Sequence, residues 1–406
     1  MNDSILYPFQ RELLARSKKN FLYAADTGSG KTLLSLHHYL KYGEGEPLLV
    51  IMPPAKYRTG DWEEEIKRVE RTYGLKMNYQ LERSSMLTKR WQAYKGYYVI
   101  VDECHQFKNP TSQRGKALAK LIQRATGFCL LSATPASNGW GDMINYFILF
   151  GFVKNKTQFN REYGVWGDQY FGSRLIHQVV DYQHKDQLKK WYQSFSLTVK
   201  KEDVLDLPPI TFKKVTFQPS KDYQTILRDR VLEDVAYDTP AALMHGLREH
   251  ANQKDKLDYL QMLLEGTEEN VVVFYQYDSE RQAIKNKIRE KLIYEVNGHR
   301  QEIPKKADWD HTKNSLTLVQ YAAGSAGIEL QYANVIVYYT PTFSYQDYTQ
   351  SLGRAYRNGQ KKKVLVLAFC TEQTIETAVW QALKHKKDFD EQLYLITKLG
   401  GKECLD

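Results

Sequence analysis

The stretch that decides the fold is Phe21-Leu22-Tyr23-Ala24-Ala25-Asp26-Thr27-Gly28-Ser29-Gly30-Lys31-Thr32. It joins a short apolar run to a glycine-bearing turn, and a helix-like segment follows. Strand, turn and helix in this order are the context of a phosphate-binding loop. Gly28 and Gly30 let the backbone curl so that amide groups point at phosphates, and the helix N-terminus adds a positive dipole end. We predict that Lys31 neutralises the β and γ phosphates and that Thr32 ligates Mg²⁺ through its hydroxyl.

A second apolar run, Tyr97–Val101, ends in the carboxylates Asp102 and Glu103. In open α/β sheets the ligand lies outside the carboxyl ends of the strands, so both side chains would face it. We expect Asp102 to hold Mg²⁺ through water and Glu103 to polarise an attacking water as general base. The alternative, a pair of solvated acids at a strand tip, is disfavoured by the phosphate loop upstream.

Apolar runs alternate with amphipathic segments along both halves of the 406-residue chain. The runs are Phe21–Ala25, Leu48–Met52, Tyr97–Val101 and Phe128–Leu131, then Val271–Tyr275, Leu316–Val319, Val335–Tyr339 and Val364–Phe369. Runs that are apolar on both faces are typical of central parallel strands covered by helices. The chain is too long for one ordinary core, so we predict an α/β protein with βαβ units twice over.

A stretch of different character, about 151–200, separates the halves. It is rich in aromatic residues and has no clear strand run, so we predict a small helical insertion on the first domain. Exposed aromatics of this stretch could stack on bases, although aromatic density more often marks a core. Pro208-Pro209 indicates the entry to the second domain. The expected domains are 1–206 and 207–406.

The composition limits the class of protein only broadly. Lysine and arginine total 57 against 48 acidic residues, giving a net charge of +9 and a pI near 9.0. A basic balance suits a polyanion, but many soluble proteins are as basic. The 4 cysteines form no CxxC pair, which argues against a zinc knuckle or a disulfide framework. We expect no signal peptide and no membrane span, and therefore a cytoplasmic or nucleoid-associated protein.

Several segments together resemble a known family. Asp102-Glu103-Cys104-His105 resembles the DExH box of helicase superfamily two, and its continuation Gln106-Phe107-Lys108-Asn109 is similar to that of the Swi/Snf-type ATPases. Leu131–Asn138 is similar to that family's third motif, which couples two lobes. Leu6–Gln10 resembles the opening motif, whose glutamine reads adenine. Gln350–Gln360 is similar to the sixth motif and is the most specific match.

Further segments agree with this resemblance, which covers roughly residues 5–385. Leu49–Pro54, with Trp62 and Glu65, resembles the motif that touches the nucleic-acid backbone. Leu197–Pro209 resembles the lobe junction, although Lys200-Lys201 stands where the family has an arginine pair. The fourth and fifth motifs are matched by Val271–Tyr277 and Ala322–Leu330.

The resemblance implies two tandem RecA-like lobes, each a mostly parallel sheet flanked by helices, with ATP and Mg²⁺ as ligands. Arg354 and Arg357 lie three apart on a helix-like segment, so they would share one face and meet the γ-phosphate. The expected catalytic residues are Lys31, Asp102, Glu103, Arg354 and Arg357. The expected ATP contacts are Gln10, Thr27, Gly28, Ser29, Gly30, Lys31, Thr32 and Gly327, with Thr32 and Asp102 on the metal. The expected nucleic-acid contacts are Pro53, Lys56, Thr134 and Gly324.

The function that these expectations favour is an ATP-dependent DNA translocase or helicase, acting on duplex or branched DNA, in which lobe closure couples hydrolysis to movement. A strand-separating helicase on RNA or single-stranded DNA is an alternative within the same class. An alternative of another class is a non-hydrolysing nucleic-acid-binding module, or a motor subunit that serves a nuclease or replication protein. We expect a compact monomer of phage or bacterial type, with room for a protein partner in replication, recombination or repair.

Overall fold

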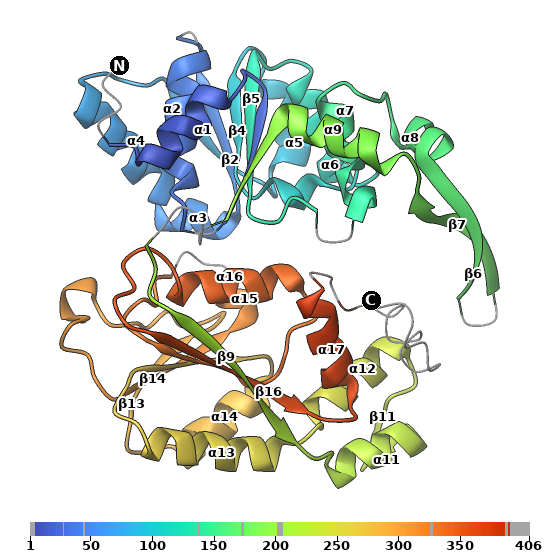
Figure 1. Cartoon of the computed structure of the whole chain (residues 1–406), viewed down its shortest axis with the longest axis vertical. Coiled ribbons are helices and arrows are strands. Elements are labelled where there is room, and N and C mark those ends of the chain that lie inside the picture. Colours follow the sequence, from blue (N-terminus) through green and yellow to red (C-terminus); the bar gives the residue numbers. More distant parts are fainter. Residues whose placement is uncertain are drawn as a thin grey trace. The chain divides into compact units, whose positions relative to one another are not determined.

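The computed structural model describes residues 5–26, 28–43, 45–136, 139–171, 174–200, 206–324, 328–385 and 389. The chain divides into two compact units, Met1–Leu205 and Asp206–Asp406 (Figure 1). This division lies one residue before the expected one.

Unit one is built on a six-stranded parallel sheet. The strand order is β3 (Tyr79–Arg83), β2 (Leu48–Met52), β4 (Tyr98–Val101), β5 (Gly127–Ser132), β1 (Phe21–Ala25) and β8 (Ser196–Val199). The helices between them are α1 (Pro8–Arg16), α2 (Lys31–Tyr42), α3 (Pro54–Thr59), α4 (Asp61–Tyr73), α5 (Leu87–Arg90), α6 (Gln113–Ile122), α7 (Ile144–Leu149), α8 (Lys156–Tyr163) and α9 (Lys185–Phe195). Short 3₁₀ turns are η1 (Trp91–Ala93), η2 (Cys104–Phe107) and η3 (Gly139–Met143).

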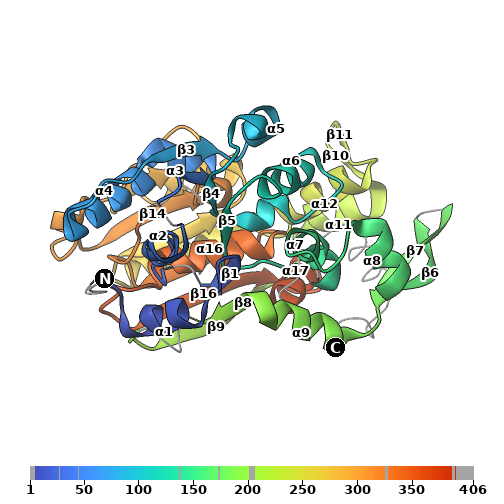
Figure 2. The same ribbon diagram turned by 90° about the horizontal axis from the view of Figure 1, so that it is seen from above.

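Alternation along the strands of unit one supplies two apolar cores, one on each face of the sheet. Tyr23 and its neighbours at even spacing pack against α1, α2 and α4. Leu22 points the other way, into a core that includes Leu118 of α6 and Phe147 of α7. Figure 2 shows these helices in layers on either side of the sheet. Because both faces are covered, the central strands are buried along their whole length, as their continuous apolar runs predicted.

Unit two repeats the plan with a second six-stranded parallel sheet. Its order is β13 (Leu292–Val296), β14 (Ser315–Gln320), β12 (Val271–Tyr275), β15 (Val335–Tyr338), β16 (Val364–Thr371) and β9 (Ile210–Phe217). Its helices are α11 (Lys221–Asp229), α12 (Pro240–Glu249), α13 (Gln253–Glu265), α14 (Asp278–Lys287), α15 (Tyr321–Gly324), α16 (Tyr345–Ala355) and α17 (Ile375–Lys384), with the 3₁₀ turn η4 (Lys306–Asp308). A short hairpin joins β10 (Val231–Leu232) to β11 (Val235–Ala236). The prediction of two tandem RecA-like lobes is confirmed.

The segment between the units differs from the prediction of a small helical insertion. α8 and α9 are helical, but between them lies an antiparallel hairpin of β6 (Gly164–Phe171) and β7 (Arg174–Tyr182), which extends away from the sheet of unit one (Figure 1). A two-stranded ribbon that is open to solvent carries no continuous apolar run, so these two strands were not predicted. Phe159 and Phe195 belong to the core, whereas Trp166 on the hairpin is half exposed and stacks on His177.

Over the part of the chain that is described, no helix is long and apolar enough to cross a membrane. Three of the cysteines, Cys104, Cys129 and Cys370, are buried free thiols.

Candidate nucleotide site

The phosphate loop lies where predicted, between β1 and α2 at the carboxyl edge of the sheet of unit one. Gly28 and Gly30 have φ of +86° and +72°, values that side-chain-bearing residues rarely adopt. Gly30 caps α2, whose first turn carries no acidic residue, so the positive end of the helix stays available to an anion. The Ser29 hydroxyl donates to the Asp26 carbonyl at 2.7 Å and closes the turn. Thr27 lies outside the described residues.

Lys31 begins α2, and its amino group folds back onto the loop. The Nζ donates to the backbone oxygens of Ala25 at 2.5 Å and Asp26 at 3.1 Å. Burial lowers the pKa of Lys31, while the nearby carboxylates of Glu103 and Asp102 oppose that shift. The ammonium is therefore held at the centre of the loop, within the electrostatic reach of both carboxylates.

Gln10 on α1 is fully buried against the loop. Its Nε2 donates to the carbonyl oxygens of Ser29 at 2.9 Å and Gly30 at 3.2 Å, and its Oε1 accepts from the Tyr7 backbone N–H at 3.0 Å. Both ends of the amide are thus used inside the protein. The glutamine fixes the loop to the first helix, and its contact with adenine remains a prediction.

Asp102 directly follows β4, and its buried carboxylate accepts three hydrogen bonds. Oδ2 accepts from Lys56 Nζ at 2.6 Å and from the Trp62 indole at 3.0 Å, and Oδ1 accepts from the Glu103 backbone N–H at 2.9 Å. Burial alone would raise the pKa of Asp102, but the charge and hydrogen bond of Lys56 and the hydrogen bond of Trp62 outweigh it and hold the pKa below its usual value. The group is therefore ionised, as a ligand for a divalent cation must be.

Lys56, predicted to contact the nucleic-acid backbone, lies beside the carboxylates of the nucleotide site. Its ammonium is 2.6 Å from Asp102 Oδ2 and 3.8 Å from Glu103 Oε1, and the contact with nucleic acid stays a prediction. The reason is the sheet order: β2 pairs with β4, so α3, which follows β2, stands beside the residues that follow β4. Trp62, which belongs to the segment that resembles the nucleic-acid motif, donates its indole N–H to Asp102. The parallel register is absent from the sequence pattern, so no local signal could have shown this.

Glu103 adopts a left-handed backbone conformation, with φ of +51°. A non-glycine residue there carries strain of about 1–2 kcal/mol, which is often a mark of a functional position. Its Oε2 is buried and has no hydrogen-bond partner within the described part of the chain, although His105 Nδ1 lies 3.4 Å away. A buried acceptor without a donor is suited to hold and polarise a water molecule.

A polar chain joins the DExH box to the third motif. His105 Nδ1 lies 3.0 Å from Ser132 Oγ at the end of β5, and that oxygen also accepts from the Thr134 backbone N–H at 3.1 Å. Burial lowers the pKa of His105, so its imidazole is neutral near pH 7. Through His105 and Ser132, these contacts link Glu103 to the backbone of Thr134. Pro53 and Thr134, both predicted to contact nucleic acid, follow the carboxyl ends of β2 and β5 at the same edge of the sheet.

The arginine segment of unit two departs from the prediction of a shared helical face. Arg354 lies in α16 and is buried, but α16 ends at Ala355 and Arg357 falls beyond it. Gln360 ends the helix, because its side-chain nitrogen donates to the Ala355 carbonyl at 3.2 Å and satisfies a group that further helix would have used. Arg357 Nη2 lies 3.7 Å from Glu329, and its buried Nε has no hydrogen-bond partner within the described part of the chain.

Gly324, the remaining expected nucleic-acid contact, is the last residue of the short helix α15, which follows β14. Gly327, expected to contact ATP, lies outside the described residues.

Mg²⁺ suits the residues present. Within the described ranges no group of three or more His, Cys, Asp and Glu side chains could hold a metal ion. A Mg²⁺ that arrives on nucleotide phosphates needs only one or two carboxylates and keeps several waters. Asp102, ionised at the edge of the sheet that also carries Thr32, meets that requirement.

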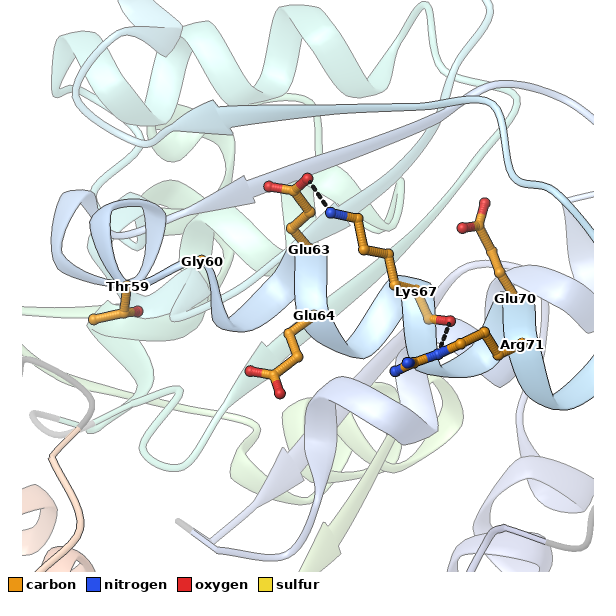
Figure 3. Close-up of a pocket in the computed structure, with 7 residues that line it drawn as sticks. All are labelled: Thr59, Gly60, Glu63, Glu64, Lys67, Glu70 and Arg71. Carbon is orange, nitrogen blue, oxygen red and sulfur yellow. Dashed lines mark hydrogen bonds and ion pairs between the residues drawn. The ribbon is translucent and has the colours of Figure 1, made fainter. Parts of the chain in front are cut away.

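A surface hollow of about 500 Å³ lies along α4 but does not belong to this site (Figure 3). Its lining is Thr59, Gly60, Glu63, Glu64, Lys67, Glu70 and Arg71, with an ion pair of 2.8 Å between Lys67 and Glu63. The five lining side chains from Glu63 to Arg71 lie on the solvent face of α4, whose opposite face buries Trp62 and Ile66. The hollow holds none of the predicted site residues.

The phosphate loop, the DExH box and the arginine segment define a helicase of superfamily two. Comparison with protein families agrees: the SNF2-related domain matches residues 71–266, and the helicase conserved C-terminal domain matches residues 254–359. The chain therefore contains a SNF2-related domain followed by a helicase conserved C-terminal domain, in agreement with the predicted resemblance to the Swi/Snf-type ATPases.

Relatives align with nearly the whole chain, but at low sequence identity. A probable chromatin-remodeling complex ATPase chain of Oryza sativa subsp. japonica is 25% identical over 95% of this chain and 40% of its own length. The uncharacterized ATP-dependent helicase YqhH of Bacillus subtilis is 21% identical over 94% of this chain and 76% of its own. The human DNA annealing helicase and endonuclease ZRANB3 is 24% identical over 94% of this chain and 40% of its own. The chain therefore spans about two fifths of the first and third of these relatives.

Among solved structures, the Sulfolobus solfataricus SWI2/SNF2 ATPase core in complex with dsDNA matches with a TM-score of 0.43 and 18% identity, over 98% of this chain and 93% of that one.

Proposed function

We propose that this chain hydrolyses ATP and uses the energy to move along DNA, with duplex or branched DNA as the preferred track. The observation that carries the proposal is Oε2 of Glu103, which is buried, has no hydrogen-bond partner among the described residues and lies within the electrostatic reach of Lys31. That pairing is what hydrolysis of a bound phosphate anhydride requires: a cation on the phosphates and an acceptor for the proton of an attacking water.

The proposed steps use the residues as they lie. The amides of the phosphate loop and the Lys31 ammonium bind the β and γ phosphates, and Lys31 gives up its loop carbonyls for them. Glu103 Oε2 orients a water and takes its proton as the terminal phosphate is released. Mg²⁺, held by Thr32 and through water by Asp102, would neutralise phosphate charge. We propose that Arg354 and Arg357 stabilise the charge that develops on the γ-phosphate.

The chain from His105 through Ser132 to Thr134 gives the nucleotide site a physical link to a segment that we propose to contact nucleic acid. A change at Glu103 on hydrolysis would shift this series of hydrogen bonds and the backbone after β5. We propose backbone contacts for Pro53, Thr134 and Gly324, which bind phosphates and carry little sequence information. The net charge of +9 favours such a partner. The name of the relative ZRANB3, a DNA annealing helicase, supports DNA as the track.

The test measures ATP hydrolysis with no nucleic acid and with duplex DNA, forked DNA, single-stranded DNA or RNA at matched phosphate concentration. We expect duplex or forked DNA to give the largest stimulation and a triplex-forming strand on the duplex to be displaced. Stimulation by RNA alone would assign an RNA helicase. Nucleotide binding without hydrolysis under any of these conditions would assign a binding module.

A further inference from the structure

We propose that Lys56 is an internal counter-ion that occupies the magnesium-binding carboxylate of Asp102 before metal and nucleotide arrive, and that it must release this carboxylate for the metal to be held. The inference rests on the proposed function, because it concerns the same site. It makes Lys56 a positioning residue of the nucleotide site. Lys56 belongs to neither the phosphate loop nor the DExH box.

The Lys56 ammonium lies close to both carboxylates. The Lys56 Nζ lies 2.6 Å from Asp102 Oδ2, which is the distance of a strong charge-assisted hydrogen bond, and 3.8 Å from Glu103 Oε1. One ammonium therefore serves both carboxylates. Lys31, the other cation of the site, is turned to the carbonyls of Ala25 and Asp26.

The two carboxylates are buried side by side. The side chains of Asp102 and Glu103 are 2% and 9% exposed, and they are adjacent in the chain. Two like charges with so little solvent are costly unless a cation pairs with them. The Lys56 side chain is 18% exposed, so its ammonium reaches the carboxylates from the open side of the site. A cation that enters from solvent would meet Lys56 at the oxygens that it needs.

Secondary structure shows how Lys56 could leave while Asp102 stays. Lys56 lies on the six-residue helix α3, which has no buried residue. The helix is capped by Gly60, whose φ is +73°. Asp102 is fixed instead by the Trp62 indole and by the Glu103 backbone N–H, which do not depend on Lys56. Loss of the ammonium would therefore open one acceptor position on Asp102 Oδ2, which keeps its hydrogen bond from Trp62, without displacing the carboxylate.

The experiment titrates Mn²⁺, a paramagnetic substitute for Mg²⁺, into protein saturated with ADP and measures the dissociation constant of the protein-bound metal by electron paramagnetic resonance. Lys56→Met removes the charge at similar length, and Lys56→Gln keeps a neutral donor in case the first variant does not fold. The matched control is Lys67→Met on the neighbouring helix α4, because Lys67 is exposed and its ion pair with Glu63 is remote from the carboxylates. Asp102→Asn tests whether the bound metal uses this carboxylate.

We expect Lys56→Met and Lys56→Gln to bind Mn²⁺ about tenfold more tightly than the wild type, the factor that corresponds to the lower end of the net value of a hydrogen bond to a charged group. Lys67→Met should match the wild type, and Asp102→Asn should bind weakly. Mn²⁺ should also raise the melting temperature of the Lys56 variants more than that of the wild type.

The proposal is overturned if folded Lys56 variants bind Mn²⁺ no more tightly than Lys67→Met does, because a lysine with a purely structural role would leave metal affinity unchanged or weaken it. This readout needs no hydrolysis and no DNA. Failure of the proposed function would appear separately, as a wild-type protein that binds Mn²⁺ but hydrolyses no ATP.

Discussion

The side-chain nitrogen of Gln10 donates to the backbone oxygen of Ser29 at 2.9 Å, so the first helix holds the phosphate loop by its main chain. A second donation, to the Gly30 carbonyl at 3.2 Å, ties the same amide to the residue that caps α2. Loop and helix are thus one mechanical unit, although 19 residues separate the two partners.

Gln10→Ala should loosen this unit. Buried carbonyl oxygens that lose a donor cost about 1–3 kcal/mol, so the free energy of unfolding in urea should fall by that amount. Because the contact acts through the loop, affinity for ATP and for GTP should fall by a similar factor, measured with fluorescent analogues. The exposed Gln187→Ala is the control. A loss confined to ATP would show that the side chain reads adenine instead.

Gly30→Ala should be more harmful than Gly96→Ala. Both glycines have positive φ, +72° and +80°, so each alanine carries strain of about 1–2 kcal/mol. A Cβ at residue 30 would also stand 2.5 Å from Gln10 Nε2, whereas a Cβ at residue 96 would meet nothing within 4 Å. Unfolding free energies of Gly30→Ala, Gln10→Ala and the double variant test this. Simple additivity of the two changes would contradict the clash.

Glu103→Gln should stop turnover while nucleotide still binds. The amide is nearly the same shape but cannot take a proton, so the rate of phosphate release should fall by a factor of about 10²–10⁴. Nucleotide affinity should stay within a few-fold of the wild type, and Glu64→Gln on the exposed face of α4 should behave as the wild type. Turnover that survives in Glu103→Gln would remove the residue from its role as base. Lys31→Ala, by contrast, should lose both binding and turnover.

Stability should fall as the pH is lowered below about 6.5, in part because of His38. Burial lowers the pKa of His38 to about 4; its ring bonds Tyr23 at 2.9 Å as the neutral form. Between pH 6.5 and 4 the imidazole is protonated in the unfolded chain but stays neutral in the folded chain. The free energy of unfolding therefore falls by about 3 kcal/mol as the pH is lowered from 6.5 to 4.

Urea unfolding at several pH values measures this dependence. His38→Gln should flatten the profile between pH 6.5 and 4, while the exposed His299→Gln should leave it unchanged. An unaltered slope in His38→Gln would contradict the assignment of a neutral, buried ring.

Arg354→Ala and Arg357→Ala should differ in stability but not in their effect on the rate. Removing either should lower the hydrolysis rate about 10³-fold, as expected for an arginine that stabilises the transferring phosphate. Arg354 is buried in α16, so its loss should also lower the unfolding free energy. Arg357 lies beyond the helix with a 3.7 Å contact to the partly exposed Glu329, which contributes little. Equal rates for Arg357→Ala and wild type would contradict its proposed role.

The sequence predicted the central strands of each sheet but not the edge strands. Every apolar run named from the sequence became a central strand, from Phe21–Ala25 to β16. The four edge strands β3, β8, β9 and β13 gave no signal, because a strand at an edge has one open side and carries polar residues. β9 is exposed along most of its length.

The sequence by itself determined the chemistry of the phosphate loop and the two carboxylates, because a strand, a glycine turn and a helix start are set by residues next to one another. Tertiary structure alone decided what surrounds them. The pairing of β2 with β4 brings Lys56 and Trp62 to Asp102 across 46 and 40 residues. The Gln360 side chain ends α16 and separates Arg357 from Arg354. Such partners are chosen by sheet order and by the demand of buried groups for hydrogen bonds, and neither is written in a local pattern.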